Sequence, residues 1–213
     1  MSATRPGSGT AAPDTSRVRR RQPPEVRRRM LLEAARSVIA ERGLHATTLR
    51  DVAAAGDVAV GTVTYHFSGM ADVLAGVLDT EMQEYSVPIM RAAEQAPTGR
   101  EALQRIVDGL LSDGERAADH WKLWLDFWAL SAHTPHYADW QTRVYQQLHE
   151  LVAGCWTRGV RDGSLISNGL PGRPSERAIS FVALLDGLVV QCYLPGSRIT
   201  CGRARELLLG MLS

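Results

Sequence analysis

The sequence predicts an all-α protein of about nine helices, divided into a small N-terminal three-helix domain and a larger helical domain. Apolar residues recur at intervals of three and four through most of the chain, which is the spacing of helices that bury one face. No stretch alternates polar and apolar residues for long enough to predict a strand. The chain has 213 residues, 45% of them hydrophobic, and this length allows a small domain beside a larger one.

Charge is distributed unevenly along the chain. Residues 1–50 hold eleven arginines and four acids, a balance of +7 in a chain whose net charge is +1. A basic end on an acidic body suits a polyanionic partner that binds at one end only. We expect residues 1–22 to form a disordered basic arm, because Gly, Ser, Thr, Ala and Pro dominate residues 1–16 and arginines follow. The arm is either a solvated tail or, as we favour, a segment that touches phosphates or enters a minor groove.

The first helix should end near Arg42, because Gly43 follows it. Residues 47–74 then organise the rest of the N-terminal domain. A short helix that starts with Leu49 can be capped by Thr47 or Thr48, and Gly56-Asp57 supplies a tight turn after it. A second short helix, about residues 59–66, should bury Val60 or Val63 together with Phe67.

The outer side chains of this second short helix suit a DNA major groove. Small residues near its start can meet base edges, while hydroxyl and imidazole groups hold phosphates. Arg50, on the short helix before the turn and two residues past Thr48, is the best candidate for reading a base, since an arginine can donate two hydrogen bonds to one guanine; a phosphate contact is the alternative. The candidate DNA-binding residues are Thr48, Arg50, Ala59, Val60, Gly61, Thr62, Thr64, Tyr65 and His66.

This stretch resembles the helix-turn-helix of TetR-family transcriptional repressors, whose pattern is A-G-V-S-x-G-T-x-Y-x-H-F followed by x-S-K-E-x-L. The matching residues are Val58, Gly61, Thr62, His66 and Phe67, followed by Asp72 and Leu74. The departures are Ala59 for serine, Thr64 for a phosphate-binding tyrosine and Met70 for lysine. The resemblance implies a DNA-binding domain over residues 23–69 and a ligand-binding and dimerisation domain over residues 70–213.

The larger domain should contain six further helices. We expect a helix from Met70 to about Ala93 that is kinked at Pro88, and a helix that opens with a capping box at residues 98–101. The remaining helices should span about residues 118–133, 135–161, 174–194 and 200–212. The helix over 118–133 is apolar nearly all round, which predicts that it is buried.

Aromatic residues are concentrated in two of these helices, and they are either plain core or the wall of a ligand pocket. A pocket of indoles would suit a cationic or flat apolar ligand, with Asp126 or Asp186 as the counter-charge. The candidate effector-binding residues are Trp121, Trp124, Phe127, Trp128, Tyr137, Trp140, Tyr145 and Asp186. The region resembles the regulatory domain of the BetI-type branch in its Trp-rich helix, its Thr134-Pro135 helix start and its Leu-Leu-Asp-Gly-Leu run at 184–188. That resemblance implies dimerisation and an unidentified small-molecule effector.

Apolar residues on the last two helices exceed what one buried face needs, so we expect some of them to contact a second copy of the chain. The candidate dimer-interface residues are Phe181, Leu184, Leu185, Leu188, Val189, Tyr193, Leu207 and Leu208.

Other classes of function find no support in the sequence. It lacks a Gly-rich phosphate loop, a Cys-x-x-Cys pair and a nucleophile elbow, so we expect neither an enzyme nor a cofactor. We expect no metal site, because His133 and His136 are too few ligands and the three cysteines lack metal-binding spacing. We expect His120 and His149 to lie either at the surface or behind the residues that form a site. No apolar run suggests a signal peptide or membrane span, which predicts a cytoplasmic protein.

These observations predict a homodimeric regulator that binds a double-stranded DNA operator, most simply a repressor released from a palindrome by an effector. The alternative is a ligand-binding or scaffolding helical dimer with weak or lost operator binding, because Thr64 and Met70 replace two expected DNA-backbone anchors.

Overall fold

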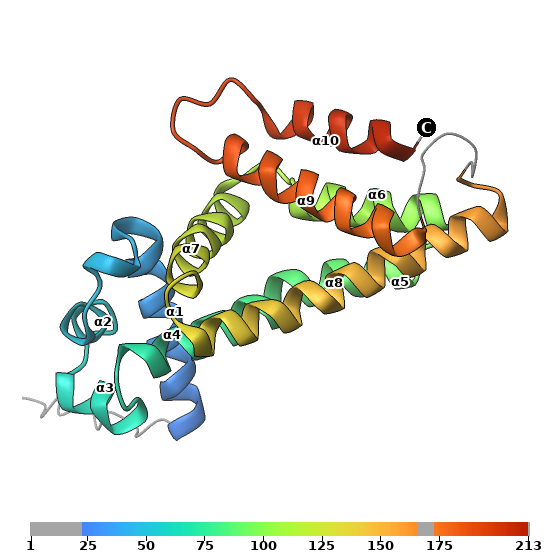
Figure 1. Ribbon diagram of the computed structural model, residues 1–213. Coiled ribbons are helices and arrows are strands. Elements are labelled where there is room, and N and C mark those ends of the chain that lie inside the picture. The colour runs from blue at the N-terminus through green and yellow to red at the C-terminus, as the bar shows by residue number, and fades with distance from the viewer. Residues whose placement is uncertain (1–22, 166–172, 213) are drawn as a thin grey trace, which may run out of the picture.

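The computed structural model describes residues 23–165 and 173–212 and is all-α over these ranges. The predicted basic arm and most of the loop before Pro174 lie outside the described residues. The N-terminal helices are α1 (Pro24–Arg42), α2 (Leu49–Ala55) and α3 (Val60–His66). Figure 1 shows them gathered at one end of the molecule, with the later helices extending away from that end.

Local sequence explains how α1, α2 and α3 begin and end. Gly43, at φ +81°, ends α1 in a left-handed conformation that favours glycine. Of the two threonines that could cap α2, Thr48 does so: its side chain accepts from the backbone N–H of Asp51, and the Asp51 carboxylate accepts from Thr48 N at 2.9 Å. Of the two valines, Val63 is fully buried against Phe67, whereas Val60 is 40% exposed.

The helix expected over residues 70–93 is continuous but irregular. It consists of α4 (Met70–Glu81), a π-helical turn η2 (Met82–Ser86) and α5 (Val87–Glu94). The irregularity therefore lies one turn before Pro88, not at Pro88 itself. Proline has no N–H to offer the carbonyl of Glu84 and crowds it, and the wider turn accommodates this, with Val87 N–H bonding to Met82 O.

The larger part of the chain adds α6 (Gly99–Leu110), α7 (Glu115–Ser131), α8 (Pro135–Asp162), α9 (Pro174–Cys192) and α10 (Cys201–Leu209), with a short 3₁₀ turn η3 (Gly210–Leu212). Half of the capping box expected at the start of α6 forms: the Thr98 side chain accepts from Glu101 N at 3.2 Å, but the Glu101 carboxylate accepts from the Thr98 hydroxyl at 3.4 Å and not from Thr98 N. Helix α7 begins three residues earlier than predicted, directly after Gly114. None of the described helices is long and apolar enough to cross a membrane.

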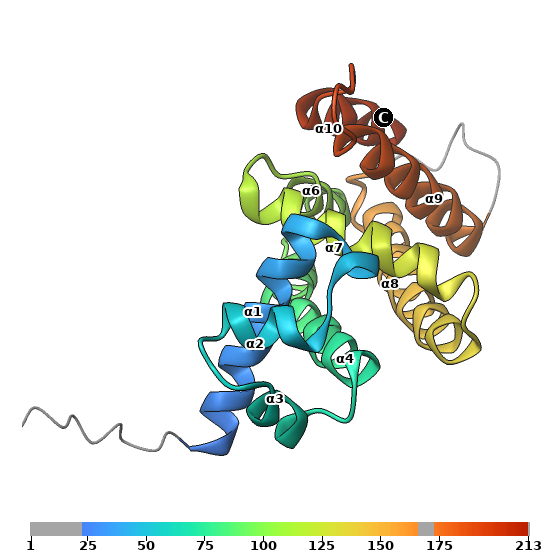
Figure 2. The same ribbon diagram turned by 90° about the vertical axis from the view of Figure 1, so that its left-hand side faces the viewer.

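One hydrophobic core runs through both parts of the molecule, from Leu31 of α1 to Leu212. Helix α7 packs on α1 and on the 3₁₀ turn η1 (Leu44–Ala46), and Figure 2 shows it beside them. A polar contact supports this packing, because Leu44 N donates to Asp126 Oδ2 at 2.6 Å. The N-terminal helices are thus joined to the larger helical part both through α4 and through α7.

Helices α6 and α8 approach each other closely where two glycines meet. A Cβ atom on Gly99 would lie 2.1 Å from Gly159 N and 2.3 Å from Cys155 O, and both of these are backbone atoms. The start of α6 is also held there by Asp162, which accepts from Gly99 N at 2.9 Å.

We predict that Gly99→Ala destabilises the protein by about 1–3 kcal/mol or more, because the added methyl group must push two backbones apart. Gly154→Ala, on the facing helix α8, is the matched control, because nothing lies within 4 Å of its Cβ position. That variant should be neutral or stabilised by up to about 1 kcal/mol. Urea denaturation measures both changes, and equal stability of the two variants would contradict the close approach.

Candidate DNA-binding surface and ligand cavity

The outer face of α3 lines an open groove beside the start of α1. The groove has a volume of about 850 Å³, and its lining includes Pro24, Arg27, Gly61, Tyr65 and His66. Tyr65 is the most exposed large side chain on this surface, at 79%. An arginine, a tyrosine and a histidine around an exposed, glycine-containing helix offer hydrogen-bond donors to a polyanion.

Some of the other predicted DNA-binding residues near the turn have exposed side chains, whereas others already form hydrogen bonds within the protein. Arg50 and Ala59 are exposed. The Thr48 hydroxyl caps α2, and the Thr64 hydroxyl donates to Gly61 O at 3.3 Å. Tyr65 follows Thr64 directly, so an exposed tyrosine stands one position after the tyrosine of the family pattern. The contacts of these residues with DNA stay predictions.

A second, smaller cavity of about 50 Å³ lies inside the larger helical part. Five of the eight predicted effector-binding residues line it: Trp121, Trp124, Trp128, Tyr145 and Asp186. Its wall also includes Met82 and Ser86 of η2, His120 of α7 and Gln141 of α8. Pockets for drug-sized ligands measure about 300–1,000 Å³, so the side chains or helices around this cavity must move before it holds more than a very small molecule.

Several polar groups of the cavity wall have unused hydrogen-bonding capacity. Trp124 Nε1, Trp128 Nε1 and Gln141 Oε1 are buried without a partner among the described residues. The Tyr145 hydroxyl donates to Asp186 Oδ2 at 2.7 Å. Burial raises the pKa of Asp186 to about 6, although the hydrogen bond from Tyr145 pulls that pKa down. Buried polar atoms are normally satisfied, so this wall is suited to a polar or charged guest.

The other three predicted effector residues lie away from this cavity. Phe127 is fully buried and packs edge-on against Trp140, with ring centroids 5.2 Å apart. Tyr137 and Trp140 line a separate hollow against α4. Trp140 stacks on Trp124 at 5.7 Å, so it supports the cavity wall from behind. Asp126, the other suggested counter-charge, is used by Leu44 N and does not line the cavity.

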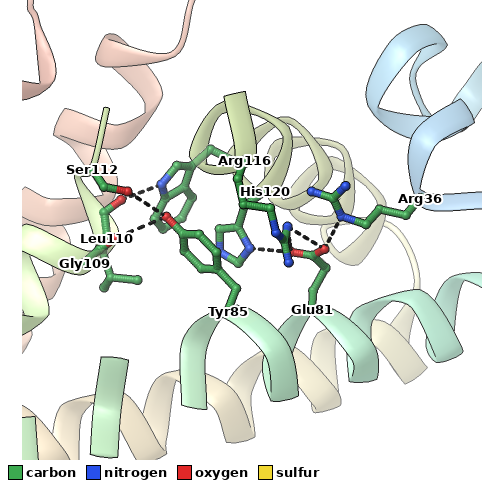
Figure 3. Close-up of polar contacts among 9 residues, drawn as sticks. Arg36, Glu81, Tyr85, Gly109, Leu110, Ser112, Arg116 and His120 are labelled. Atoms are coloured by element: carbon green, nitrogen blue, oxygen red, sulfur yellow. Dashed lines mark hydrogen bonds and ion pairs between the residues drawn. The ribbon is translucent and has the colours of Figure 1, made fainter. Parts of the chain in front are cut away.

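Figure 3 shows a buried ionic cluster of Glu81, Arg36, Arg116 and His120, called the Glu81 cluster, and His120 of this cluster also lines the cavity. Glu81, the last residue of α4, is fully buried. Its carboxylate accepts a hydrogen bond from Arg36 Nε of α1. From α7 it accepts hydrogen bonds from Arg116 Nη1, at 2.9 Å to each oxygen, and from His120 Nδ1 at 2.7 Å. Burial alone would raise the pKa of Glu81, but the hydrogen bonds from His120, Arg116 and Arg36 lower it to about 2. The carboxylate is therefore ionised, and it ties α1, α4 and α7 together.

His120 connects this cluster to the cavity. It is 1% exposed, so of the two expected positions, at the surface or behind a site, the surface position is wrong. Burial lowers its pKa and the hydrogen bond to Glu81 raises it; the net shift is downward, so the ring is neutral at neutral pH. Because a carboxylate only accepts hydrogen bonds, the single ring proton sits on Nδ1. The ring stacks on Tyr85 of η2, with centroids 3.9 Å apart.

Most of the predicted dimer-interface residues are interior residues of the single chain. Those that are at most 3% exposed, and so have no surface left for a partner, are Phe181, Leu185, Leu188, Val189 and Leu208. They pack inside because α9 is covered by α8 on one side and α10 on the other. Tyr193 is half-buried, and its hydroxyl donates to Ser112 O at 2.9 Å. Leu184 is half-buried and Leu207 is 41% exposed, and both remain interface candidates.

Sequence reasoning missed the Glu81 cluster, although one signal for it was present. Leu74, Val77 and Leu78 form the buried face of α4, and Glu81 continues that face at the next turn. A glutamate in an apolar register is a candidate for a buried, paired charge.

Two family models match the N-terminal and C-terminal parts of this chain. Residues 31–77 match the family described as bacterial regulatory proteins, tetR family. Residues 99–213 match the C-terminal domain of the BetI-type transcriptional repressor. The HTH-type transcriptional regulator BetI of Burkholderia thailandensis is 28% identical over 186 residues, which cover 86% of this chain and 90% of that protein. The BetI of Escherichia coli is 27% identical with similar coverage.

Solved structures show the same fold. A protein from Saccharomonospora viridis, described as a transcriptional regulator and solved in complex with choline, superposes with a TM-score of 0.80 at 25% identity, covering 88% of this chain and 95% of that one. A TetR transcription regulator from Haloarcula marismortui has a TM-score of 0.77 at 14% identity, covering 88% and 97% of the two chains, and shows likeness of fold alone.

Asp186 should make folding depend on pH. Because its pKa rises from 3.8 to about 6 on folding, the folded protein without a bound cation holds this proton more tightly than the unfolded chain does. The resulting stabilisation is complete below about pH 4 and is lost as pH rises through about 6. Asp186→Asn should remove this part of the pH dependence, at most about 3 kcal/mol.

Urea denaturation across about pH 4 to 7 measures this difference. Asp139→Asn, an exposed carboxylate on the same helix as Tyr145, is the control and should follow the wild-type curve. An unchanged pH dependence in Asp186→Asn would show that its carboxyl is not the group that titrates.

Proposed function

Since the chain belongs to the TetR family of bacterial transcriptional regulators, with a BetI-type C-terminal domain, we propose that it is a repressor released from DNA by a small organic cation. The family is one of DNA-binding regulators and not of enzymes. The observation that carries the ligand class is the cavity wall: indole faces, one half-buried carboxylate and unused polar atoms around a single space.

The chemistry of the wall favours a cation with a small polar group. Indole faces attract quaternary and protonated amines, by about 2 kcal/mol or more when desolvated. The Asp186 carboxylate gains an ionic partner only from a cation. The indole N–H groups of Trp124 and Trp128 need an acceptor, and Gln141 Oε1 needs a donor, which a hydroxyl group supplies together. Choline, found in the Saccharomonospora viridis structure, combines a quaternary nitrogen with a hydroxyl group.

The DNA-binding state requires two copies of α3. We propose a homodimer built on the outer faces of α9 and α10 and the loop between them, where Leu184 of α9, Leu194 of the loop and Leu207 of α10 offer apolar surface. A twofold dimer repeats each contact, and it would place two recognition helices about 34–36 Å apart on a palindromic operator. The basic arm, residues 1–22, precedes Pro23 at the edge of the α3 groove and would add phosphate or minor-groove contacts.

Choline should bind the protein and weaken its binding to DNA. Trp124→Phe should raise the Kd for choline about 3- to 30-fold, because the cavity loses one indole face and its N–H group. Trp156→Phe removes an equally buried indole that packs on Phe181 away from the cavity, so its choline affinity should match wild type. Calorimetry gives the affinities, and fluorescence anisotropy gives DNA release.

The neutral carbon isostere of choline is the ligand control, and it should bind far more weakly because it lacks the charge. Equal binding of choline and its isostere, or equal losses in the two tryptophan variants, would contradict the cation site. DNA binding that ignores choline would remove effector release from the proposal.

Arg50→Ala should relax the preference for one base pair in each half-site by about 1–3 kcal/mol and leave binding to random duplex nearly unchanged. The operator for this measurement is selected by the protein itself from a pool of random duplexes. Competition between single-base variants of that selected operator gives the discrimination at each position.

Removal of residues 1–22 is the contrasting change, because it deletes five arginines and should lower affinity without altering base preference. The salt dependence should become shallower by about 0.9 for each phosphate that the arm contacts. Equal losses of Arg50→Ala on operator and random DNA would make Arg50 a phosphate contact. Failure to enrich any duplex would favour the alternative, a ligand-binding dimer without operator binding.

A further inference from the structure

The Glu81 cluster lies at the junction between the DNA-binding helices and the cavity. Helix α4 begins just after α3 and ends at Glu81, where the π-helical turn η2 starts. Two residues of η2, Met82 and Ser86, belong to the cavity wall. One continuous helical segment therefore carries the recognition helix at one end and part of the cavity at the other.

The partners of Glu81 come from both sides of this junction. Arg36 belongs to α1, which packs on α2, whereas Arg116 and His120 belong to α7. Both arginines keep part of their side chains in solvent, with 20% and 41% exposed. Arg36 holds Glu81 through Nε, while its Nη2 has no partner among the described residues. The Arg36 tie is therefore a single hydrogen bond, which costs less to break than a bidentate pair.

The cavity reaches this cluster through His120. The His120 ring lies 5.0 Å from Trp121 and 6.0 Å from Trp124 between centroids, and all three line the cavity. Tyr85 covers the other face of the ring, and its hydroxyl donates to Gly109 O at 3.1 Å. Because the cavity is only about 50 Å³, a choline-sized guest must displace part of this packed wall.

The π-helical turn is the part of the cavity wall where the regular α-helical hydrogen bonding is interrupted. Its hydrogen bond joins Val87 N to Met82 O, and Pro88 supplies no N–H to the preceding turn. A shift of the helix axis there changes the position of Glu81, which directly precedes it, relative to α1 and α7.

We propose that Glu81 is the positioning residue that couples the cavity to the DNA-binding helices: displacement of His120 by a bound ligand alters its hold on the carboxylate, and the tie to Arg36 changes with it. The inference rests on the proposed function. It adds Glu81, which lines neither the cavity nor the groove, as the residue through which ligand binding affects DNA binding. The coupling is a difference between two packings, since a ligand shifts an equilibrium only by binding the two states unequally.

The test is the coupling ratio, defined as the Kd for operator at saturating choline divided by the Kd without choline. Couplings of this kind are typically about 5- to 150-fold. In Glu81→Gln and in Arg36→Gln the ratio should fall to about twofold or less. Choline affinity measured by calorimetry should stay within about threefold of wild type, since neither residue lines the cavity. Because the Arg36 side chain is partly exposed, Arg36→Gln should fold, and it still tests the inference if Glu81→Gln does not fold.

Asp126→Ala is the matched control, because Asp126 also ties α7 to the N-terminal part, through Leu44 N, but does not touch His120 or the cavity. This variant should keep the full wild-type ratio. A wild-type ratio retained in Glu81→Gln and Arg36→Gln would overturn the inference while leaving the proposed function intact. Equal loss in Asp126→Ala would also overturn it, because coupling would then be spread over the whole interface. A wild-type ratio of one would contradict the proposed function and the inference together.

Discussion

One ionised carboxylate, buried where three helices meet, is the constraint around which the rest of this structure is arranged. Removing a carboxylate from water costs several kcal/mol, and only well-placed partners offset that cost. Glu81 has three such partners, one from α1 and two from α7, and its lowered pKa reflects their combined effect. Loss of any one partner would leave a charge that is incompletely satisfied. The relative placement of α1, α4 and α7 is therefore specified by charge as well as by apolar packing.

The cavity differs from the Glu81 cluster, because several polar atoms of its wall lack hydrogen-bond partners in the described part of the chain. Two indole N–H groups and one amide oxygen lack partners among the described residues, and the one carboxylate has its pKa raised to about 6 by burial. A guest that carries a positive charge and a hydroxyl group would relieve these deficits. The small volume means that such a guest also has to displace the wall, which includes η2 and His120. Satisfying the cavity and disturbing the Glu81 cluster are thus linked by geometry.

Particular residues show how far the sequence predicts this arrangement. Trp124 and Trp128 lie four residues apart on one helix face, so the sequence groups them, but it leaves the counter-charge open between Asp126 and Asp186, of which only Asp186 lines the cavity. Helical periodicity also locates α3 and its exposed Tyr65. Helical periodicity also groups Phe127 and Trp140 with this site, whereas neither residue lines the cavity, because periodicity identifies a face of a helix but not the neighbour that this face meets.

Contacts between distant segments explain what the sequence does not predict. Glu81 is 45 residues from Arg36 and 39 from His120, and no local pattern links them. The apolar character of α9 on more than one side places Leu185 and Leu188 at a dimer interface, whereas α8 and α10 cover those sides within the same chain. Pro88 predicts a simple kink, because the sequence marks the proline but not the π-helical turn that accommodates it.

The central claim is that the cavity and the DNA-binding surface are energetically coupled, and reciprocity gives its most direct measurement. The Kd of wild-type protein for choline should be determined by calorimetry twice, once for the free protein and once with saturating selected operator. The account predicts that operator weakens choline binding by the same factor by which choline weakens operator binding. The same Kd for choline in the two measurements would contradict the account, because two sites that do not affect each other cannot form a switch.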